Sequence, residues 1–105
     1  MERRGHAARR FRKRVEVRYG INQPECTGYS GNISQTGMMV RAVRVFGPGI
    51  TLNLELKFHE KTIKLRGLVT WAREGTVLLL PTGRVGMGIR FVDPPDDLLK
   101  VLQES

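Results

Sequence analysis

Apolar and polar residues alternate along several short segments of the chain, and this pattern constrains the fold most. Its clearest case lies between residues 50 and 57, where the apolar members are Ile50, Leu52, Leu54 and Leu56. A period of two is typical of a β-strand that buries one face. The segment follows Gly47, Pro48 and Gly49, which form a turn signal. A strand is therefore predicted here.

Further strand patterns recur along most of the chain. They cover residues 15–19, 26–34, 38–43, 63–71, 77–80 and 85–92, and turn signals separate them at residues 20–24, 59–61, 74–75 and 81–83. Six or seven short strands with regularly spaced turns favour a closed or nearly closed antiparallel barrel. Trp71 and Phe91 are expected to belong to its core.

One helix is predicted at the end of the chain. Pro94 and Pro95 precede Asp96, and an acidic residue in the first turn complements the helix dipole. Leu98, Leu99 and Leu102 follow at helical spacing. With 105 residues, of which 40% are hydrophobic, the chain suits a single mainly β domain with a modest core.

Positive charge is concentrated at the N-terminus. Residues 1–14 contain seven Lys or Arg and one Glu, so they carry +6 of the formal net charge of +8. This distribution indicates a local anionic partner rather than a whole surface made for polyanions. We expect residues 1–8 to be a flexible basic tail and residues 9–105 to form the domain.

The sequence does not suggest an enzyme. His6 and His59 have no carboxylate or cysteine at ligand spacing, and Cys26 lacks an activating partner. No metal, cofactor or internal disulfide is therefore expected. The sequence shows no signal peptide and no apolar run long enough for a membrane span, which predicts a cytoplasmic protein without membrane insertion.

Two polar elements flank the predicted strands in the first third of the chain. Arg10 and Arg14 directly precede one strand, and Asn32, Ser34 and Gly37 end the next. Two guanidiniums beside a compact set of hydrogen-bonding groups suit a ligand with phosphates and purine edges. RNA or DNA is disfavoured because aromatic residues make up only 7% of the chain and single-strand binders use aromatic stacking. Phe11 and Tyr29 are the accessible candidates.

These elements, together with residues 67–71 and 86–92, resemble the PilZ domain family. The arginines match its Arg-x-x-x-Arg motif, and residues 32–37 match its (Asp/Asn)-x-Ser-x-x-Gly motif. The resemblance covers residues 9–105. It implies a six-stranded antiparallel β-barrel with a short C-terminal helix and a flexible basic N-terminal arm. It also implies a bacterial receptor for cyclic di-GMP that performs no catalysis.

The resemblance assigns roles to the motif residues. Arg10 and Arg14 would contact phosphate or guanine, and Asn32 and Ser34 would contact the guanine edge or orient the arginines. Gly37 would permit a turn or close approach. Asn32, in place of the Asp alternative, lacks an anionic acceptor for guanine, which implies slightly weaker binding.

Arginines outside the two motifs receive less specific roles. An arginine at the place of Arg9 is associated in this family with binding of two intercalated ligands, so the resemblance implies a pair here. Arg73 and Arg84 are candidates for a further ligand contact, although solvated charges at strand ends are the simpler interpretation.

Three functions stay open at the level of sequence. The first is a receptor whose mobile arm orders over cyclic di-GMP and signals in trans to an unidentified effector protein. The second is an interaction adaptor of the same family that binds no nucleotide. The third is a basic barrel that binds RNA or DNA. A monomer and a homodimer are both compatible with the sequence.

Overall fold

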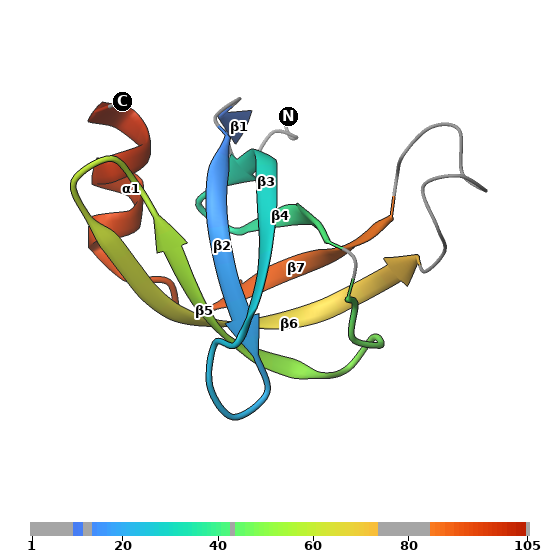
Figure 1. The fold of residues 1–105 in the computed structure, drawn as a ribbon. Helices are drawn as coiled ribbons and strands as arrows, with labels where there is room; N and C mark the ends of the chain where they lie inside the picture. The colour runs from blue at the N-terminus through green and yellow to red at the C-terminus, as the bar shows by residue number, and fades with distance from the viewer. Residues whose placement is uncertain (1–9, 12–13, 43, 74–84, 105) are drawn as a thin grey trace, which may run out of the picture.

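The structure is a computed structural model, and it describes residues 10–11, 14–42, 44–73 and 85–104 (Figure 1). Its elements in chain order are β1 (Arg10–Phe11), β2 (Val15–Gly20), β3 (Cys26–Ser34), β4 (Gly37–Arg41), β5 (Thr51–Lys57), β6 (Thr62–Arg73), β7 (Gly86–Val92) and α1 (Asp96–Glu104).

The strands form one antiparallel sheet that closes on itself. Its order is β1-β3-β2-β5-β6-β7-β4, and β3 also pairs with β4. Among the described residues, β2 to β7 therefore form a six-stranded barrel, and β1 lies beside β3 (Figure 1). This confirms the predicted antiparallel barrel with one short C-terminal helix.

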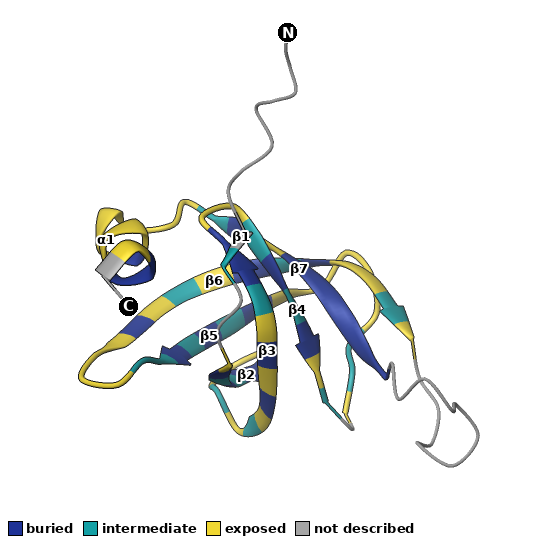
Figure 2. Ribbon diagram, turned by 90° about the horizontal axis from the view of Figure 1, so that it is seen from above, coloured by how far each residue is buried: buried dark blue, intermediate teal, exposed yellow. Residues whose placement is uncertain are grey.

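The alternation of apolar residues produces the core as predicted. Leu52, Leu54 and Leu56 of β5 are buried, whereas Ile50, which precedes the strand, is exposed. Across the β2–β5 pair, Val17 lies opposite Leu56 and Tyr19 lies opposite Leu54. Each such side chain contributes about 1.5–3 kcal/mol when it is removed from water, so these paired positions are a main source of stability. Figure 2 shows buried positions alternating with more exposed ones along strands such as β3 and β6.

The C-terminal helix packs against the barrel with one face. Asp96 and Asp97 lie in the first turn of α1, as predicted, and the side chains of Leu98, Val101 and Leu102 join the core. Lys61 in the β5–β6 turn donates a hydrogen bond to Asp97 at 2.9 Å. This contact lowers the pKa of the Asp97 carboxyl, and it connects the helix start to the barrel.

Two predicted elements cannot be compared with the structure, and one observed strand was not predicted. The predicted turn at 74–75 and strand at 77–80 fall within residues 74–84, which are not described. Strand β1 was not predicted from the sequence. Its two residues pair with Ile33 and Ser34 of β3.

The prediction that Trp71 lies in the core is wrong, whereas Phe91 is buried as expected. Trp71 is 44% exposed. In the β6–β7 pairing, Val69 lies opposite Ile89 and Trp71 lies opposite Gly88, with a register shift between them. Thr70 is thus an extra residue on β6, and such a bulge reverses the alternation of faces that follows it. Trp71 is therefore turned to the outer face.

The same bulge explains why a glycine lies opposite the tryptophan. The Thr70 hydroxyl donates to the carbonyl of Gly88 at 3.2 Å. A Cβ added to Gly88 would lie 2.0 Å from Nε1 of Trp71, which is too close for any real contact. The indole therefore rests directly on the backbone of β7.

Tyr19 anchors the connection between β4 and β5. Its ring meets Phe46 edge-on, with centroids 6.1 Å apart and planes at 89°, and its hydroxyl donates to the carbonyl of Arg44. Tyr19 is fully buried. Loss of this partly buried hydrogen bond would leave the Arg44 carbonyl without its Tyr19 donor, so the bond should matter for stability.

Replacing Tyr19 by phenylalanine tests this anchor. Tyr19→Phe keeps the ring and removes the donor, so we expect the free energy of unfolding to fall by about 1 kcal/mol in urea denaturation at pH 7. Tyr29→Phe, at an exposed ring, is the matched control and should change stability by less than about 0.5 kcal/mol. Equal stability of Tyr19→Phe and wild type would contradict this role.

The pH dependence provides a second readout of the same contact. Burial raises the pKa of Tyr19 from 10.0 to about 12. The neutral phenol is favoured in the folded state, so its contribution is fully present below pH 10 and is lost as the pH rises toward 12. The stability advantage over Tyr19→Phe should shrink across that range, whereas a constant difference would contradict the assignment.

Candidate functional site

Strand β1 places the arginine motif beside the residues of the second motif. Arg10 pairs with Ser34, and Phe11 pairs with Ile33. Ile33 pairs with Met38 of β4 as well, so β1 must use the other edge of β3, which is the edge used by β2. The arginine motif therefore lies along the edge of β3 that also pairs with β2, and β3 itself carries Asn32 and Ser34 of the second motif.

The chain from β1 to β2 has one residue more than the part of β3 with which these two strands pair. Five positions separate Arg10 from Val15, whereas four separate their partners Ser34 and Ser30. The pairing of β1 with β3 is therefore shifted by one residue relative to a regular continuation of the β2–β3 pairing.

Ser34 builds the turn between β3 and β4. Its Oγ accepts hydrogen bonds from the backbone N–H groups of Thr36 at 3.2 Å and Gly37 at 3.3 Å, and it lies 3.1 Å from Oγ1 of Thr36. A Cβ at Gly37 would lie 2.5 Å from the carbonyl oxygen of Ile89. Ser34 and Gly37 are thus required for the shape of this turn, and their contact with a ligand stays a prediction.

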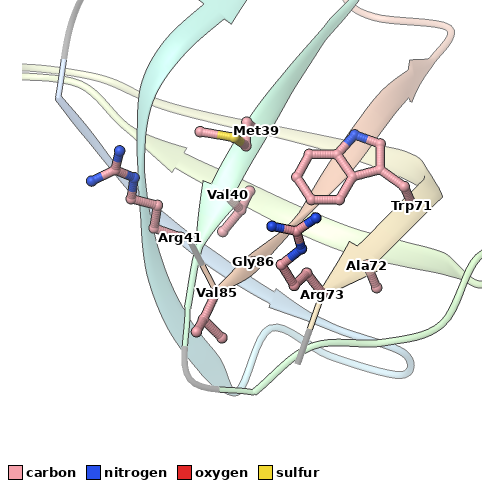
Figure 3. A pocket seen from close by; sticks show the side chains of 8 residues that line it. All are labelled: Met39, Val40, Arg41, Trp71, Ala72, Arg73, Val85 and Gly86. Carbon is pink, nitrogen blue, oxygen red and sulfur yellow. The ribbon is translucent and has the colours of Figure 1, made fainter. Parts of the chain in front are cut away.

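Three adjoining cavities lie on the outer face of the barrel around this turn. The motif cavity, about 520 Å³, is lined by Asn32, Ser34, Thr36, Gly37, Met38, Met39, Thr70, Trp71, Gly88, Ile89 and Arg90. The arginine cavity, about 530 Å³, is lined by Arg14, Tyr29, Gly31, Asn32, Met39 and Arg41. The tryptophan cavity, about 460 Å³, is lined by Met39, Val40, Arg41, Trp71, Ala72, Arg73, Val85 and Gly86 (Figure 3).

Shared lining residues make the three cavities one continuous surface. Met39 lines all three, Asn32 lines the motif and arginine cavities, and Trp71 lines the motif and tryptophan cavities. Their volumes lie within the range of about 300–1,000 Å³ that is typical of small-molecule sites. A ligand larger than one cavity can therefore extend across the face without crossing a buried barrier.

The charge of this face has one sign. Its described lining residues include four arginines, Arg14, Arg41, Arg73 and Arg90, and no carboxylate. Figure 3 shows Trp71 and Arg73 of β6 extending over the tryptophan cavity, with Arg41 on β4. Guanidiniums bind phosphate oxygens through paired hydrogen bonds, and exposed aromatic rings offer a surface for flat bases.

Arg14 contacts the aromatic ring of Tyr29. Its guanidinium carbon lies 4.4 Å from the ring centroid, within the distance of a cation–π interaction. Both residues line the arginine cavity together with Asn32. The structure thus brings a member of the first motif and a member of the second motif to the same cavity.

The structure says less about the other arginines that the sequence singled out. Arg10 belongs to β1 through its backbone pairing, while Arg9 and Arg84 lie outside the described residues. Arg73 lines the tryptophan cavity.

Sequence reasoning missed several residues of this face. Met39, Arg41 and Arg90 were not singled out, although they occupy outward positions of their strands, and a strict period-two reading of residues 37–41 and 86–92 would have shown this. Trp71 had no such signal, because the bulge at Thr70 cannot be seen in the alternation.

Two other kinds of site have no support in the part of the chain that the structure describes. There, no group of three or more His, Cys, Asp or Glu side chains is arranged to hold a metal ion. Nor does any described helix have the length and apolar character needed to cross a membrane.

Comparison with known proteins agrees with the geometry. The family model of the PilZ domain matches residues 2–105. The fold is similar to that of the Bacillus subtilis inhibitor of motility, MotI/DgrA, with a TM-score of 0.75 and 20% sequence identity over 99% of this chain and 50% of that chain. This chain thus spans about half the length of that protein. No curated protein matches the sequence.

The family model matches nearly all residues, and the structure is an antiparallel barrel in which the arginine motif lies beside Asn32 and Ser34 of β3. The chain therefore belongs to the PilZ domain family.

Proposed function

We propose that the chain is a receptor for cyclic di-GMP, which binds across the motif and arginine cavities on the outer face of the barrel. The observation that carries this proposal is the pairing of β1 with β3, which places Arg10 opposite Ser34. Arg14 and Asn32 meet at the arginine cavity nearby. The two family motifs are thus parts of one surface.

The chemistry of the face matches this ligand. Cyclic di-GMP carries two phosphates and two guanines. An arginine fork binds either a phosphate or the O6 and N7 acceptors of guanine, so Arg10 and Arg14 have partners on it. Asn32 would contact a guanine edge, while Ser34 and Gly37 hold the turn that presents Asn32. Trp71 offers an exposed ring on which a base can stack.

Binding would be followed by signalling rather than catalysis. In this proposal the N-terminal arm, residues 1–14, closes over the ligand, and the new surface is recognised in trans by an effector protein in the cytoplasm of a bacterium. Because β1 already pairs with β3, closure starts from an anchored strand. The Bacillus protein of similar fold is an inhibitor of motility, so a motility system is one candidate for the output.

A second candidate function is an interaction adaptor that binds no nucleotide. The observation that favours it is the exposure of Trp71 and Tyr29 on one face, because aromatic side chains are enriched at protein interfaces. The two candidates differ in a direct way, since only the receptor binds cyclic di-GMP in the absence of another protein.

Substitution of the motif arginines tests the receptor. Arg10→Ala and Arg14→Ala should each weaken binding of cyclic di-GMP by about 1.5–3 kcal/mol, the range for hydrogen bonds to charged groups. That is roughly tenfold to 150-fold in Kd, measured by isothermal titration calorimetry. Arg66→Ala is the matched control, because Arg66 is an exposed arginine of β6 that does not line the three cavities.

The outcomes separate the site from a general effect of charge. Equal losses in all three variants would indicate loss of net charge alone. Unchanged binding in both motif variants would contradict the site.

The number of ligands tests the role of Arg9. With Arg9 present, we expect calorimetry to give two molecules of cyclic di-GMP per chain, because a third guanidinium can hold a second, intercalated ligand. Arg9→Leu should reduce this number to one. A stoichiometry of one that does not change in Arg9→Leu would show that Arg9 has no such role.

A further inference from the structure

Tyr29 does not belong to the core, yet it lines the arginine cavity. It is 41% exposed, and in the sheet it pairs with Glu16 of β2 and with Arg41 of β4. The guanidinium of Arg14 lies over its ring at 4.4 Å. Tyr29 is thus flanked by one arginine at the start of β2 and another at the end of β4.

We propose that Tyr29 is a positioning residue that holds Arg14 in its binding orientation, and that a purine ring enters the cavity over Gly31 beside this pair. The choice of ligand rests on the proposed function. The contact between Arg14 and Tyr29 does not depend on it.

An Arg14 side chain that is already oriented before the ligand binds should increase the affinity for that ligand. A free arginine side chain loses rotamer entropy when it is immobilised, and a ligand that must order it binds more weakly. The cation–π contact with Tyr29 offsets part of that cost, because it favours one orientation of Arg14 before the ligand arrives. The guanidinium face on Tyr29 leaves the N–H groups at its edge available to an anion.

Gly31 gives the cavity an open floor. A Cβ added to Gly31 would meet no heavy atom within 4 Å, whereas at Gly28, in the same strand, it would lie 2.8 Å from the carbonyl oxygen of Arg41. Packing of the described residues therefore does not require glycine at position 31, although glycine weakens a strand. Gly31 lies in the register shift between Tyr29 and Asn32 of the β3–β4 pair, where glycine is common. Its missing side chain also allows close approach of a flat ligand to the backbone.

Arg41 completes the arrangement on the other side. It is exposed on β4, opposite Tyr29 in the β3–β4 pair, and it lines the same cavity as Gly31. A purine over Gly31 would therefore have a guanidinium on either side. This subsite takes a flat ring with an acceptor edge, and it adds to the contacts of the two sequence motifs.

A double-mutant cycle tests the positioning role. In calorimetry with cyclic di-GMP, Tyr29→Phe should bind within twofold of wild type, because it keeps the ring. Tyr29→Leu should bind about three- to tenfold more weakly. In an Arg14→Gln background, Tyr29→Leu should change Kd by less than twofold, since the ring then has no guanidinium to hold. Equal costs of Tyr29→Leu in both backgrounds would overturn the proposal, as would unchanged binding in the single variant.

Substitution of Gly31 tests the subsite. Gly31→Val should leave the urea unfolding midpoint unchanged or raise it, since valine favours strands, and it should weaken binding of cyclic di-GMP by tenfold or more. Thr27→Val, at another exposed position of β3 outside the cavity, is the control and should bind as wild type. Wild-type affinity of a folded Gly31→Val chain would overturn the subsite.

A measurement without ligand separates this inference from the proposed function. In NMR spectra of the free protein, ring current from Tyr29 should shift the side-chain protons of Arg14 upfield, and Tyr29→Leu should abolish that shift. Its absence in wild type would overturn the positioning role. If the shift is present and the wild-type chain binds no cyclic di-GMP, the proposed function is wrong and the subsite for its purine with it, while the Arg14–Tyr29 contact is confirmed.

Discussion

Hydrogen bonding along both edges of β3 closes this barrel, and the candidate site depends on it. One edge of β3 pairs with β1 and β2, and the other pairs with β4. The turn that joins β3 to β4 is held by the Ser34 hydroxyl, which accepts hydrogen bonds from two backbone N–H groups. Without this closure, Arg10 and Asn32 would belong to unconnected loops. With it, Arg10 of β1 and Asn32 of β3 lie on neighbouring, paired strands, and a short polar sequence becomes part of a surface.

A single extra residue on β6 gives that surface its aromatic side chain. The bulge at Thr70 turns Trp71 outward, and Gly88 leaves room for the indole on β7. Outward positions of β4, β6 and β7 supply Arg41, Arg73 and Arg90. The barrel thus separates two tasks. Its inner face supplies stability through alternating apolar residues, and its outer face carries arginines and aromatic rings, a combination that would suit a ligand with phosphates and flat bases.

Local sequence patterns predicted most of the strands and the helix, whereas β1 and the exposure of Trp71 depend on pairing between strands that are distant in the sequence. Alternation over residues 50–57 was sufficient for β5, and the acidic start at Asp96 was sufficient for α1, because both signals arise within a few neighbouring residues. The two motifs identified one side of the candidate face. Strand β1 was missed, since two residues carry no period and their pairing depends on β3. Trp71 was misplaced, because a bulge is a property of two strands together and leaves no mark in the alternation of one. Met39, Arg41 and Arg90 were within reach of a stricter use of the period.

We propose that one outer face of the barrel, with Trp71 beside the motif residues, binds cyclic di-GMP. The sequence contains a single tryptophan, so intrinsic fluorescence reports on this face alone. We predict a saturable change in Trp71 emission with cyclic di-GMP, and little change with GTP or an oligonucleotide at equal concentration, in low and in moderate salt. No response to cyclic di-GMP in fluorescence or calorimetry would contradict the claim. So would a stronger response to the oligonucleotide that falls steeply with salt, because that is the signature of binding to a nucleic acid backbone.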